Sequence, residues 1–288
     1  MENLICYKQM PLWKAVTLPK MFQEQHNTQV GTWAKLTIFK GNLDVALLEE
    51  NGDVIQRDRF SVACQPPFLK PQEWHKIASC SSDLECQLSF YCLPEDYTQK
   101  KYGMTKTHSE VINAVRYIKP CKALDFGCGS GRNALYLNKL GFDVTACDKN
   151  TQNISALQDL IQSESLSHLS AQVFNINQQS IEESYDFILS TVVFMFLDKE
   201  RVPGIIRNMQ DKTNNGGYNL IVSAMSTPDF PCSVPFSFLF NHDELKHYYQ
   251  DWEIIKYNQD VGELHKTDAE GKRIKLRFAT MLAKKVGE

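Results

Sequence analysis

The chain has 288 residues, of which 43% are hydrophobic and 23% charged, a composition that provides a packed core and excludes a disordered chain. Its 31 Lys and Arg residues and 34 Asp and Glu residues give a formal net charge of −3, so no positive field favours nucleic acid or an anionic membrane. The longest apolar run, 192–197, is too short for a membrane-spanning helix, and the N-terminus shows no secretory signal. We therefore expect a cytoplasmic protein that binds neither nucleic acid nor a membrane.

The cysteine pattern concerns the redox state and metal binding. The nine Cys residues include no C-x-x-C pair, which favours reduced, mostly buried thiols over a disulfide framework or a zinc site. We accordingly predict no metal site.

Residues 1–93 have the pattern of a small all-β domain. Alternating apolar and polar residues predict strands over 32–39, 43–48, 54–60 and 84–92. The pair Asn51-Gly52 is typical of a tight hairpin, and the three prolines within 65–75 predict a loop, since proline cannot donate to a strand ladder. Several short strands at this spacing predict a sandwich or a small barrel.

Residues 94–288 alternate strands with helices. Thr107 and Glu110 have the spacing of a capping box at the start of a helix that Pro120 ends. Strands are expected over 123–126, 144–147, 171–174, 185–189 and 218–222, and helices over 133–140, 152–163, 199–210 and 243–250. This order predicts an α/β domain with a mostly parallel sheet and helices on both faces. Two further strands, 252–257 and 274–283, have no helix between them and predict an antiparallel hairpin at the end of the sheet.

A glycine cluster, Asp125-Phe-Gly-Cys-Gly-Ser-Gly131, lies between a predicted strand and a predicted helix. Gly127 and Gly129 allow the backbone to turn sharply and to approach a ligand closely. Asp148 ends the next strand, where a carboxylate can meet ribose hydroxyls. Together these features predict an adenosine-containing cofactor at the carboxyl ends of the strands.

Three details favour S-adenosylmethionine over a nicotinamide cofactor. The third glycine comes one residue early for the dinucleotide fingerprint. The carboxylate of Asp125 would repel a pyrophosphate but can accept hydrogen bonds from the ammonium group of an amino acid. The antiparallel hairpin at the end of the sheet resembles that of the class I methyltransferases.

Longer motifs make the resemblance specific. Residues 125–133, 185–193, 216–222 and 260–268 are similar to motifs of the TehB-type tellurite-resistance methyltransferases, and the likeness extends over most of 95–286. Residues 26–33 and 71–75 resemble the cupin-like domain that precedes the methyltransferase in some members. The resemblance implies a cupin-like β domain over 1–93 and a Rossmann-like class I methyltransferase domain over 94–288.

The resemblance implies methyl transfer from S-adenosylmethionine to a small inorganic oxyanion, tellurite and also selenite, which yields less toxic volatile species and confers tellurite resistance. Te(IV) and Se(IV) keep a lone pair, so the acceptor needs no general base, and the enzyme mainly aligns the reactants and holds an anion. Three alternatives remain open: methylation of a small organic thiol or other nucleophile, a cofactor-binding sensor without turnover, and an NAD-dependent oxidoreductase, which Asp125 and the early glycine disfavour.

The resemblance also assigns the candidate cofactor residues. Asp125, Gly127 and Gly129 are expected at the methionine end, Asp148 and Lys149 at the ribose, Asn175 and Ile176 at adenine, Thr191 and Val193 at the floor, Lys101 and Tyr102 in a lid, and Asn133 in the first motif. Asn175 replaces the acid usual in the family. For the outer contacts, a solvated loop residue is an equally good interpretation.

The candidate catalytic residues are His265 and Arg273, expected at the oxyanion. His265 and Lys266 are predicted in the loop between the last two strands, and Arg273, Lys275 and Arg277 share one face of the final strand by its period of two. A solvated strand face is the alternative interpretation for these cations. His26 and His75 could be two ligands of a cupin metal, but no third ligand is identifiable.

Overall fold

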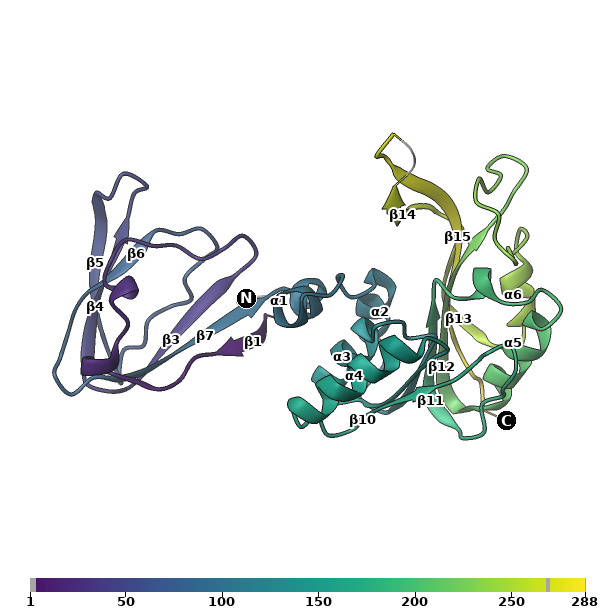
Figure 1. Ribbon diagram of the computed structural model, residues 1–288, viewed down its shortest axis with the longest axis horizontal. Helices are drawn as coiled ribbons and strands as arrows, with labels where there is room; N and C mark the ends of the chain where they lie inside the picture. The colour runs from purple at the N-terminus through teal and green to yellow at the C-terminus, as the bar shows by residue number, and fades with distance from the viewer. Residues whose placement is uncertain (1–3, 268–269, 288) are drawn as a thin grey trace. The chain divides into compact units, whose positions relative to one another are not determined.

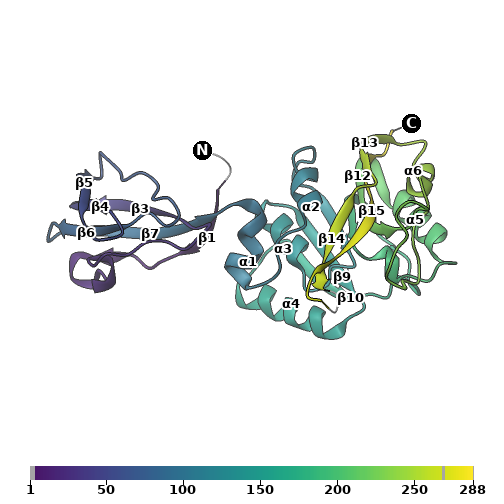
Figure 2. The ribbon, with the colours of Figure 1, turned by 90° about the horizontal axis from the view of Figure 1, so that it is seen from above.

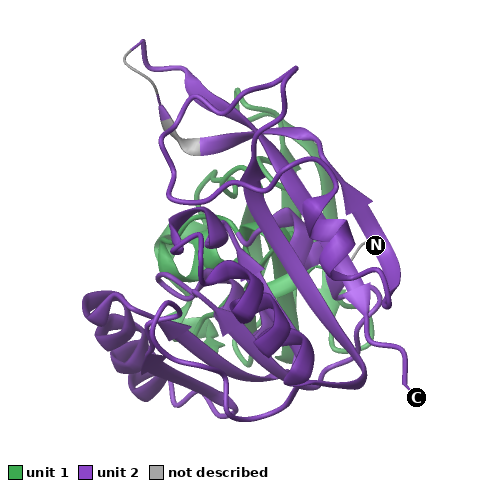
Figure 3. Cartoon of the chain, turned by 90° about the vertical axis from the view of Figure 1, so that its right-hand side faces the viewer, with its two compact units in different colours: residues 1–106 green, residues 107–288 purple. Residues whose placement is uncertain are grey.

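The computed structural model describes residues 4–267 and 270–287. The chain forms two compact units, residues 1–106 and 107–288 (Figure 3). The first unit therefore includes residues 94–106, which the sequence analysis assigned to the second domain. All nine Cys residues lie in the described part of the chain and are free thiols. No helix in this part is long and apolar enough to cross a bilayer.

The first unit consists of two antiparallel sheets (Figure 1). In one sheet the central strand is β7 (Glu85–Cys92), and its partners are β1 (Ile5–Gln9), β2 (Trp13–Lys14) and β3 (Trp33–Lys40). In the other, β4 (Asn42–Leu48) lies between β5 (Val54–Ser61) and β6 (His75–Cys80). Inward-facing side chains of both sheets, among them Ile38, Leu43 and Cys86, pack into one apolar core. The unit ends with helix α1 (Tyr97–Tyr102).

The predicted strands of the first unit are confirmed, with ends displaced by at most one residue, whereas β1, β2 and β6 were not predicted. β1 and β2 are short and follow one another along one edge of β7, so neither has a long alternating pattern. β6 begins at His75, the last residue of the predicted loop. The loop therefore ends where the prolines predict, but the strand that begins at His75 was not predicted.

The second unit contains an eight-stranded sheet in the order β10-β9-β8-β11-β12-β15-β13, with β14 paired to β15. The strands are β8 (Lys122–Phe126), β9 (Asp143–Asp148), β10 (Leu169–Val173), β11 (Tyr185–Thr191), β12 (Thr213–Met225), β13 (Glu253–Asn258), β14 (Val261–Thr267) and β15 (Arg273–Lys284). The first five strands in this order are parallel, and β15 runs antiparallel to β12, β13 and β14. The predicted parallel sheet with an antiparallel end is confirmed.

Helices cover both faces of this sheet, as predicted. They are α2 (Ser109–Ala114), α3 (Arg132–Lys139), α4 (Thr151–Ser163), α5 (Val202–Asp211) and α6 (Glu244–Tyr248). Figures 1 and 2 show α3 and α4 on one face and α5 and α6 on the other. An apolar cluster of the unit joins α5 and the segment around α6 to the sheet.

Three local predictions for the second unit are wrong: the residue that caps α2, the end of α2 and the number of strands in the last part of the sheet. The residue that caps α2 is His108, whose Nδ1 accepts from the Glu110 amide at 3.2 Å, and not Thr107; the helix ends at Ala114 rather than near Pro120. β14 was not predicted, so the last part of the sheet has three strands instead of two.

A chain of buried hydrogen bonds connects α5, β12 and the end of α6. The Tyr249 hydroxyl donates to Asn219 Oδ1 at 2.8 Å, and Asn219 Nδ2 donates to Thr213 Oγ1 at 2.7 Å. Thr213 Oγ1 in turn donates to the Met209 carbonyl at 2.7 Å. All of these groups are buried, so each depends on the next to satisfy its hydrogen-bonding capacity.

Replacing Tyr249 with Phe leaves the buried Oδ1 of Asn219 without its donor. We expect the free energy of unfolding of the second unit to fall by about 1–3 kcal/mol. Urea denaturation of the full chain measures this loss. The matched control is Tyr117→Phe, because Tyr117 is 60% exposed; its change should stay below about 0.5 kcal/mol. Equal losses in the two variants would contradict the account.

Candidate functional site

The carboxyl ends of four neighbouring parallel strands form one edge of the sheet. β8 contains Asp125, β9 ends at Asp148 and β11 ends at Thr191. The register pairs Asp125 with Leu189 of β11 on one side and with Ala146 of β9 on the other. Ligands of open α/β sheets bind at such an edge, where the loops that follow the strands meet.

The glycine loop after β8 is shaped by close packing. Gly127 has φ +88°, and a Cβ placed there would lie 2.5 Å from Cγ2 of Val193. The amides of Gly127 and Cys128 both donate to the Cys147 carbonyl at 2.9 Å, which fastens the loop to β9. A Cβ at Gly129, where φ is +56°, would meet nothing within 4 Å. The loop therefore needs glycine at 127 for packing and has open space at 129, where a ligand can approach the backbone.

Asp125 is a buried carboxylate, 1% exposed. Burial raises its pKa to about 7, although a hydrogen bond from the Ala134 amide and the charge of Arg132 act in the opposite direction. Its Oδ2 has no hydrogen-bond partner among the residues that the structure describes. A buried carboxylate of this kind is stabilised by a cationic donor, so the position suits the ammonium group of a ligand.

Asp148 connects the glycine loop to the start of α4. Its Oδ2 accepts from the Gly129 amide and its Oδ1 from the Asn150 amide, each at 2.9 Å. Asn150, in turn, caps α4 by accepting from the amides of Gln152 and Asn153. A carboxylate oxygen has a second lone pair, so Asp148 can still accept from a ligand hydroxyl. Lys149 is exposed beside it.

The structure gives Asn133 and Thr191 partners within the protein. Asn133 is buried, its Oδ1 accepts from the His108 amide at 3.1 Å, and its Nδ2 donates to Thr191 Oγ1 at 3.0 Å. The pair thereby fixes the start of α2 against the end of β11. Both side chains position the loops of the site, and direct contact with a cofactor stays a prediction.

The segment after β10 contains Asn175 and Ile176. Asn175 Oδ1 accepts from the Asn177 amide at 3.1 Å, which forms a local turn. Ile176 is buried in the core next to this turn. The two residues follow the strand as expected, and their role at adenine remains a prediction.

Sequence reasoning missed Val192, which lies between Thr191 and Val193. Its φ is +61°, a left-handed conformation that is uncommon for a β-branched residue. Its amide donates to the Val222 carbonyl at 2.7 Å, and its side chain packs in an apolar cluster. Backbone strain of this kind concentrates at functional sites. No signal in a single sequence marks a valine for this conformation.

Lys101 and Tyr102, the predicted lid residues, lie in α1 of the first unit. The Lys101 ammonium is 5.6 Å from the centre of the Tyr102 ring. Their role at the cofactor stays a prediction.

The cations of β15 begin at the same edge of the sheet. The register pairs Arg277 with Met225, the last residue of β12, and residues 273–276 continue beyond it alongside β14. The Arg277 guanidinium donates to Asp229 Oδ2 at 2.9 Å and to the Gln259 carbonyl at 3.1 Å, and it lies over the Phe230 ring. Asp229 and Phe230 were not predicted, because they are distant from Arg277 in the sequence.

The rest of the predicted oxyanion patch is more exposed. The Arg273 guanidinium is 3.9 Å from the Glu263 carboxylate, and Lys275 is paired with Glu263 in the strand register. Leu276 on the opposite face is buried, which confirms the predicted alternation. His265 and Lys266 belong to β14 and not to a loop, so that prediction is wrong. Their side chains lie outside the described residues.

The two candidate metal ligands of the first unit lie close together. The ring centres of His26 and His75 are 4.2 Å apart. Within residues 4–267 and 270–287, no group of three or more His, Cys, Asp or Glu side chains is placed to hold a metal ion.

Comparison with known proteins agrees with this geometry. Residues 90–282 match the family model described as "Tellurite resistance protein TehB", and residues 8–88 match the TehB-like domain. The chain is 57% identical over 284 residues to the "Probable S-adenosyl-L-methionine-dependent methyltransferase TehB" of Haemophilus influenzae (strain 10810), with 99% of both chains covered. It is 48% identical over 244 residues to "Hemagglutinin 1" of Eikenella corrodens, with 85% of this chain and 81% of the relative covered.

A solved structure shows the same fold. The crystal structure of TehB from Haemophilus influenzae matches with a TM-score of 0.85 and 57% identity, and the match covers 99% of each chain. The orphaned Oδ2 of Asp125 and the open space at Gly129 fit a cofactor that carries both an ammonium group and an adenosine. The chain therefore belongs to the TehB family, is a methyltransferase of the class I fold, and uses S-adenosylmethionine as its cofactor.

Proposed function

We propose that this methyltransferase transfers a methyl group to tellurite and selenite. Conversion of the methylated oxyanions into volatile species then requires electrons from a separate reductant, such as a cellular thiol. The observation that carries the proposal is the register of β15. In this register the first residues of β15, which include the cations Arg273, Lys275 and Arg277, lie at and beyond the carboxyl end of β12. The name of the matching family supports the same acceptor. The nine free cysteines support a reducing, cytoplasmic location.

The cofactor site is proposed at the carboxyl ends of β8 and β9. The Asp125 carboxylate would accept hydrogen bonds from the ammonium group, and Asp148 would accept from the ribose hydroxyls. Gly129 would allow close approach of the backbone, since a Cβ there would project into open space. When bound, S-adenosylmethionine supplies an electrophilic methyl group on its sulfonium sulfur.

The acceptor would bind on the face of β15 that carries the cations, where the strand extends beyond β12. The opposite face of β15 packs into an apolar core cluster through Ile274, Leu276 and Phe278. On the cationic face a guanidinium can donate charge-assisted hydrogen bonds to an oxyanion. Arg277 is held by Asp229, so Arg273 and Lys275, both exposed, are better placed to meet an anion from solvent.

The chemistry of the acceptor matches such a site. The chalcogen lone pair would form the new bond to the methyl carbon, and the electron pair of the broken carbon–sulfur bond would leave with the sulfur as a neutral thioether. No proton would need to be removed. The protein then contributes alignment and electrostatic attraction rather than a general base.

A small organic thiol is the second candidate acceptor. The apolar cluster that contains Val192 and Phe236 favours it, because a neutral apolar body would pack against these side chains. A thiol, however, must lose its proton before attack, so its methylation would rise with pH up to the pKa of the thiol.

Replacing Asp148 with Ala tests the proposed cofactor site. We expect the dissociation constant for S-adenosylmethionine to rise by about tenfold to a hundredfold, because hydrogen bonds to the ribose are lost, equivalent to about 1–3 kcal/mol. Isothermal titration calorimetry measures it. Asp143→Ala is the matched control, since Asp143 is exposed at the opposite end of β9. An unchanged constant for Asp148→Ala would reject the assignment.

The acceptor is tested by mass spectrometry of the solution and of its head space, with a labelled methyl group on S-adenosylmethionine. Separate incubations contain tellurite, selenite or a simple thiol, and we expect labelled methylated tellurium and selenium only with protein present. Arg273→Ala should raise the KM for the oxyanion by about tenfold through the loss of a charge-assisted hydrogen bond. Its cofactor affinity should be unchanged.

Arg57→Ala, a substitution of an exposed arginine on β5, is the control for loss of a positive charge. If only the incubation with the thiol yields a labelled product, while cofactor binding is intact, the acceptor is a small organic thiol. Loss of cofactor binding in Arg273→Ala would show that Arg273 is misplaced.

A further inference from the structure

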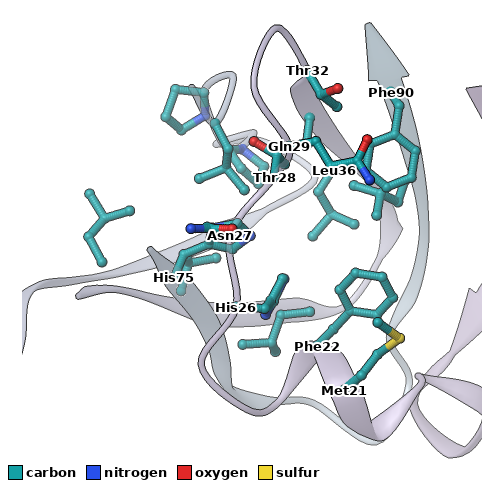
Figure 4. Close-up of a pocket in the computed structure, with 18 of the residues that line it drawn as sticks. Met21, Phe22, His26, Asn27, Thr28, Gln29, Thr32, Leu36, His75 and Phe90 are labelled. Atoms are coloured by element: carbon teal, nitrogen blue, oxygen red, sulfur yellow. The ribbon is translucent and has the colours of Figure 1, made fainter. Parts of the chain in front are cut away.

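The first unit contains a cavity of about 480 Å³ between its two sheets (Figure 4). Its walls include Leu36 of β3, Phe90 of β7, Val45 of β4 and Ile77 of β6. A cavity of this volume lies within the range of sites for small organic molecules. It lies entirely within residues 1–106, and none of its lining residues belongs to the strand edge at which the cofactor is proposed to bind.

The cavity lies where the two sheets of the first unit diverge. At one end Ile38 is 1% exposed, Leu43 and Cys86 are fully buried, and the sheets are in close contact. Two residues further along each strand, Leu36 and Leu88 are 7% and 6% exposed, and Phe90 beyond them is half-buried. The inward-facing side chains thus remain apolar where the core ceases to be filled. Apolar walls around a cavity favour an apolar occupant.

One wall of the cavity is a row of aromatic rings. The ring centres of Trp13 and Phe22 are 5.0 Å apart, those of Phe22 and His26 are 5.1 Å apart, and those of His26 and His75 are 4.2 Å apart. All four residues line the cavity, and Figure 4 shows Phe22 beside His26. Aromatic rings pair favourably with other rings in tilted and edge-on geometries, so this wall favours an aromatic ligand.

The two imidazoles provide hydrogen-bond acceptors to the cavity. His75 Nδ1 lies 2.7 Å from the Glu73 carbonyl, and His26 Nδ1 lies 2.9 Å from the Glu24 carbonyl. A carbonyl can only accept, so each Nδ1 carries a proton. An imidazole in this tautomer has a lone pair on Nε2. Neither Nε2 has a hydrogen-bond partner in residues 4–267 and 270–287. Burial lowers the pKa of His75 to about 4, which keeps its ring neutral near pH 7.

Three charged residues line the cavity, namely Lys8, Lys100 and Asp58. Lys8 is exposed to solvent, so water screens its charge. Lys100 Nζ donates to the Val30 carbonyl at 2.7 Å and to Thr32 Oγ1 at 3.0 Å. Asp58, which also lines the cavity, would repel a carboxylate. The imidazole lone pairs would repel an anion as well, whereas they attract a neutral O–H or N–H donor.

We propose that this cavity binds a small neutral aromatic molecule whose hydroxyl or N–H donates to Nε2 of His26 or His75. The first unit is then a ligand-binding module. The proposal is independent of the acceptor that the methyltransferase uses.

The experiment uses the full chain with 5-fluorotryptophan and follows the Trp13 resonance by fluorine NMR during titration with three probes. The Trp13→Phe variant assigns the resonance. The probes are 4-propylphenol, its methyl ether 4-propylanisole, and 4-propylbenzoate, which share an apolar body and differ in the polar end. We expect the phenol to bind about tenfold more tightly than the ether, because only the phenol donates to an imidazole.

His26→Phe keeps an aromatic ring and removes one acceptor, so it should reduce the preference for the phenol and leave the affinity for the ether intact. His242→Phe is the matched control, since the side chain of His242 is 69% exposed and lies in the second unit. Retained binding of the ether shows that His26→Phe is folded. If that variant does not fold, the preference of the unmodified chain for the phenol over the ether and the benzoate decides the proposal.

Three outcomes would overturn the proposal. One is the absence of a Trp13 shift with all probes, and another is equal or tighter binding of the ether or the benzoate. The third is phenol binding that disappears with a chelator, which would assign the imidazoles to a metal. Calorimetric titration of the same samples with S-adenosylmethionine tests the cofactor site separately. A chain that binds the cofactor but none of the probes would contradict this proposal and leave the proposed methyl transfer intact.

Discussion

The carboxylate of Asp125 is buried at the end of β8, and the loops of the site are arranged around it. Removing a charge from water is costly unless a cation or hydrogen-bond donors compensate. The protein supplies the Ala134 amide and the charge of Arg132, but these do not restore the usual acidity, and the pKa of Asp125 remains raised to about 7. The site is therefore incomplete without a cationic partner, which the ammonium group of S-adenosylmethionine provides in our account.

The neighbouring groups follow from the same edge of the sheet. Asp148 holds the Gly129 amide, and the Gly127 and Cys128 amides bond to β9, so the glycine loop has little freedom. Asn133 joins α2 to the end of β11 through Thr191. Hydrogen bonds within the protein thus position the loops in advance, and this reduces the entropy lost when a ligand binds. Under the proposed function the acceptor reacts through a lone pair and mainly requires alignment, which this rigidity would favour.

The sequence predicted the parallel sheet, its antiparallel end and the glycine loop because each has a local signature. The strand β8, the glycines and Asp148 follow one another within a short segment. Because β8 and β9 pair in parallel, the glycines and Asp148 lie at the same end of the sheet. The Arg277–Asp229 pair, the left-handed Val192 and the three short strands of the first unit depend on contacts between distant segments. No periodicity in a single chain encodes such contacts, and the cavity of the first unit is of the same kind, because it arises where two sheets diverge.

The most direct test of this account is proton release when S-adenosylmethionine binds. At pH 6 a carboxyl group with a pKa near 7 is mostly protonated, and an ammonium group at hydrogen-bond distance would lower that pKa and expel the proton, so binding should release up to about 0.9 proton. Calorimetric titration in buffers of different ionisation enthalpy measures this number. We expect the release in the unmodified chain and its loss in Asp125→Asn. Binding without proton release at pH 6 would contradict the placement of the ammonium group at Asp125.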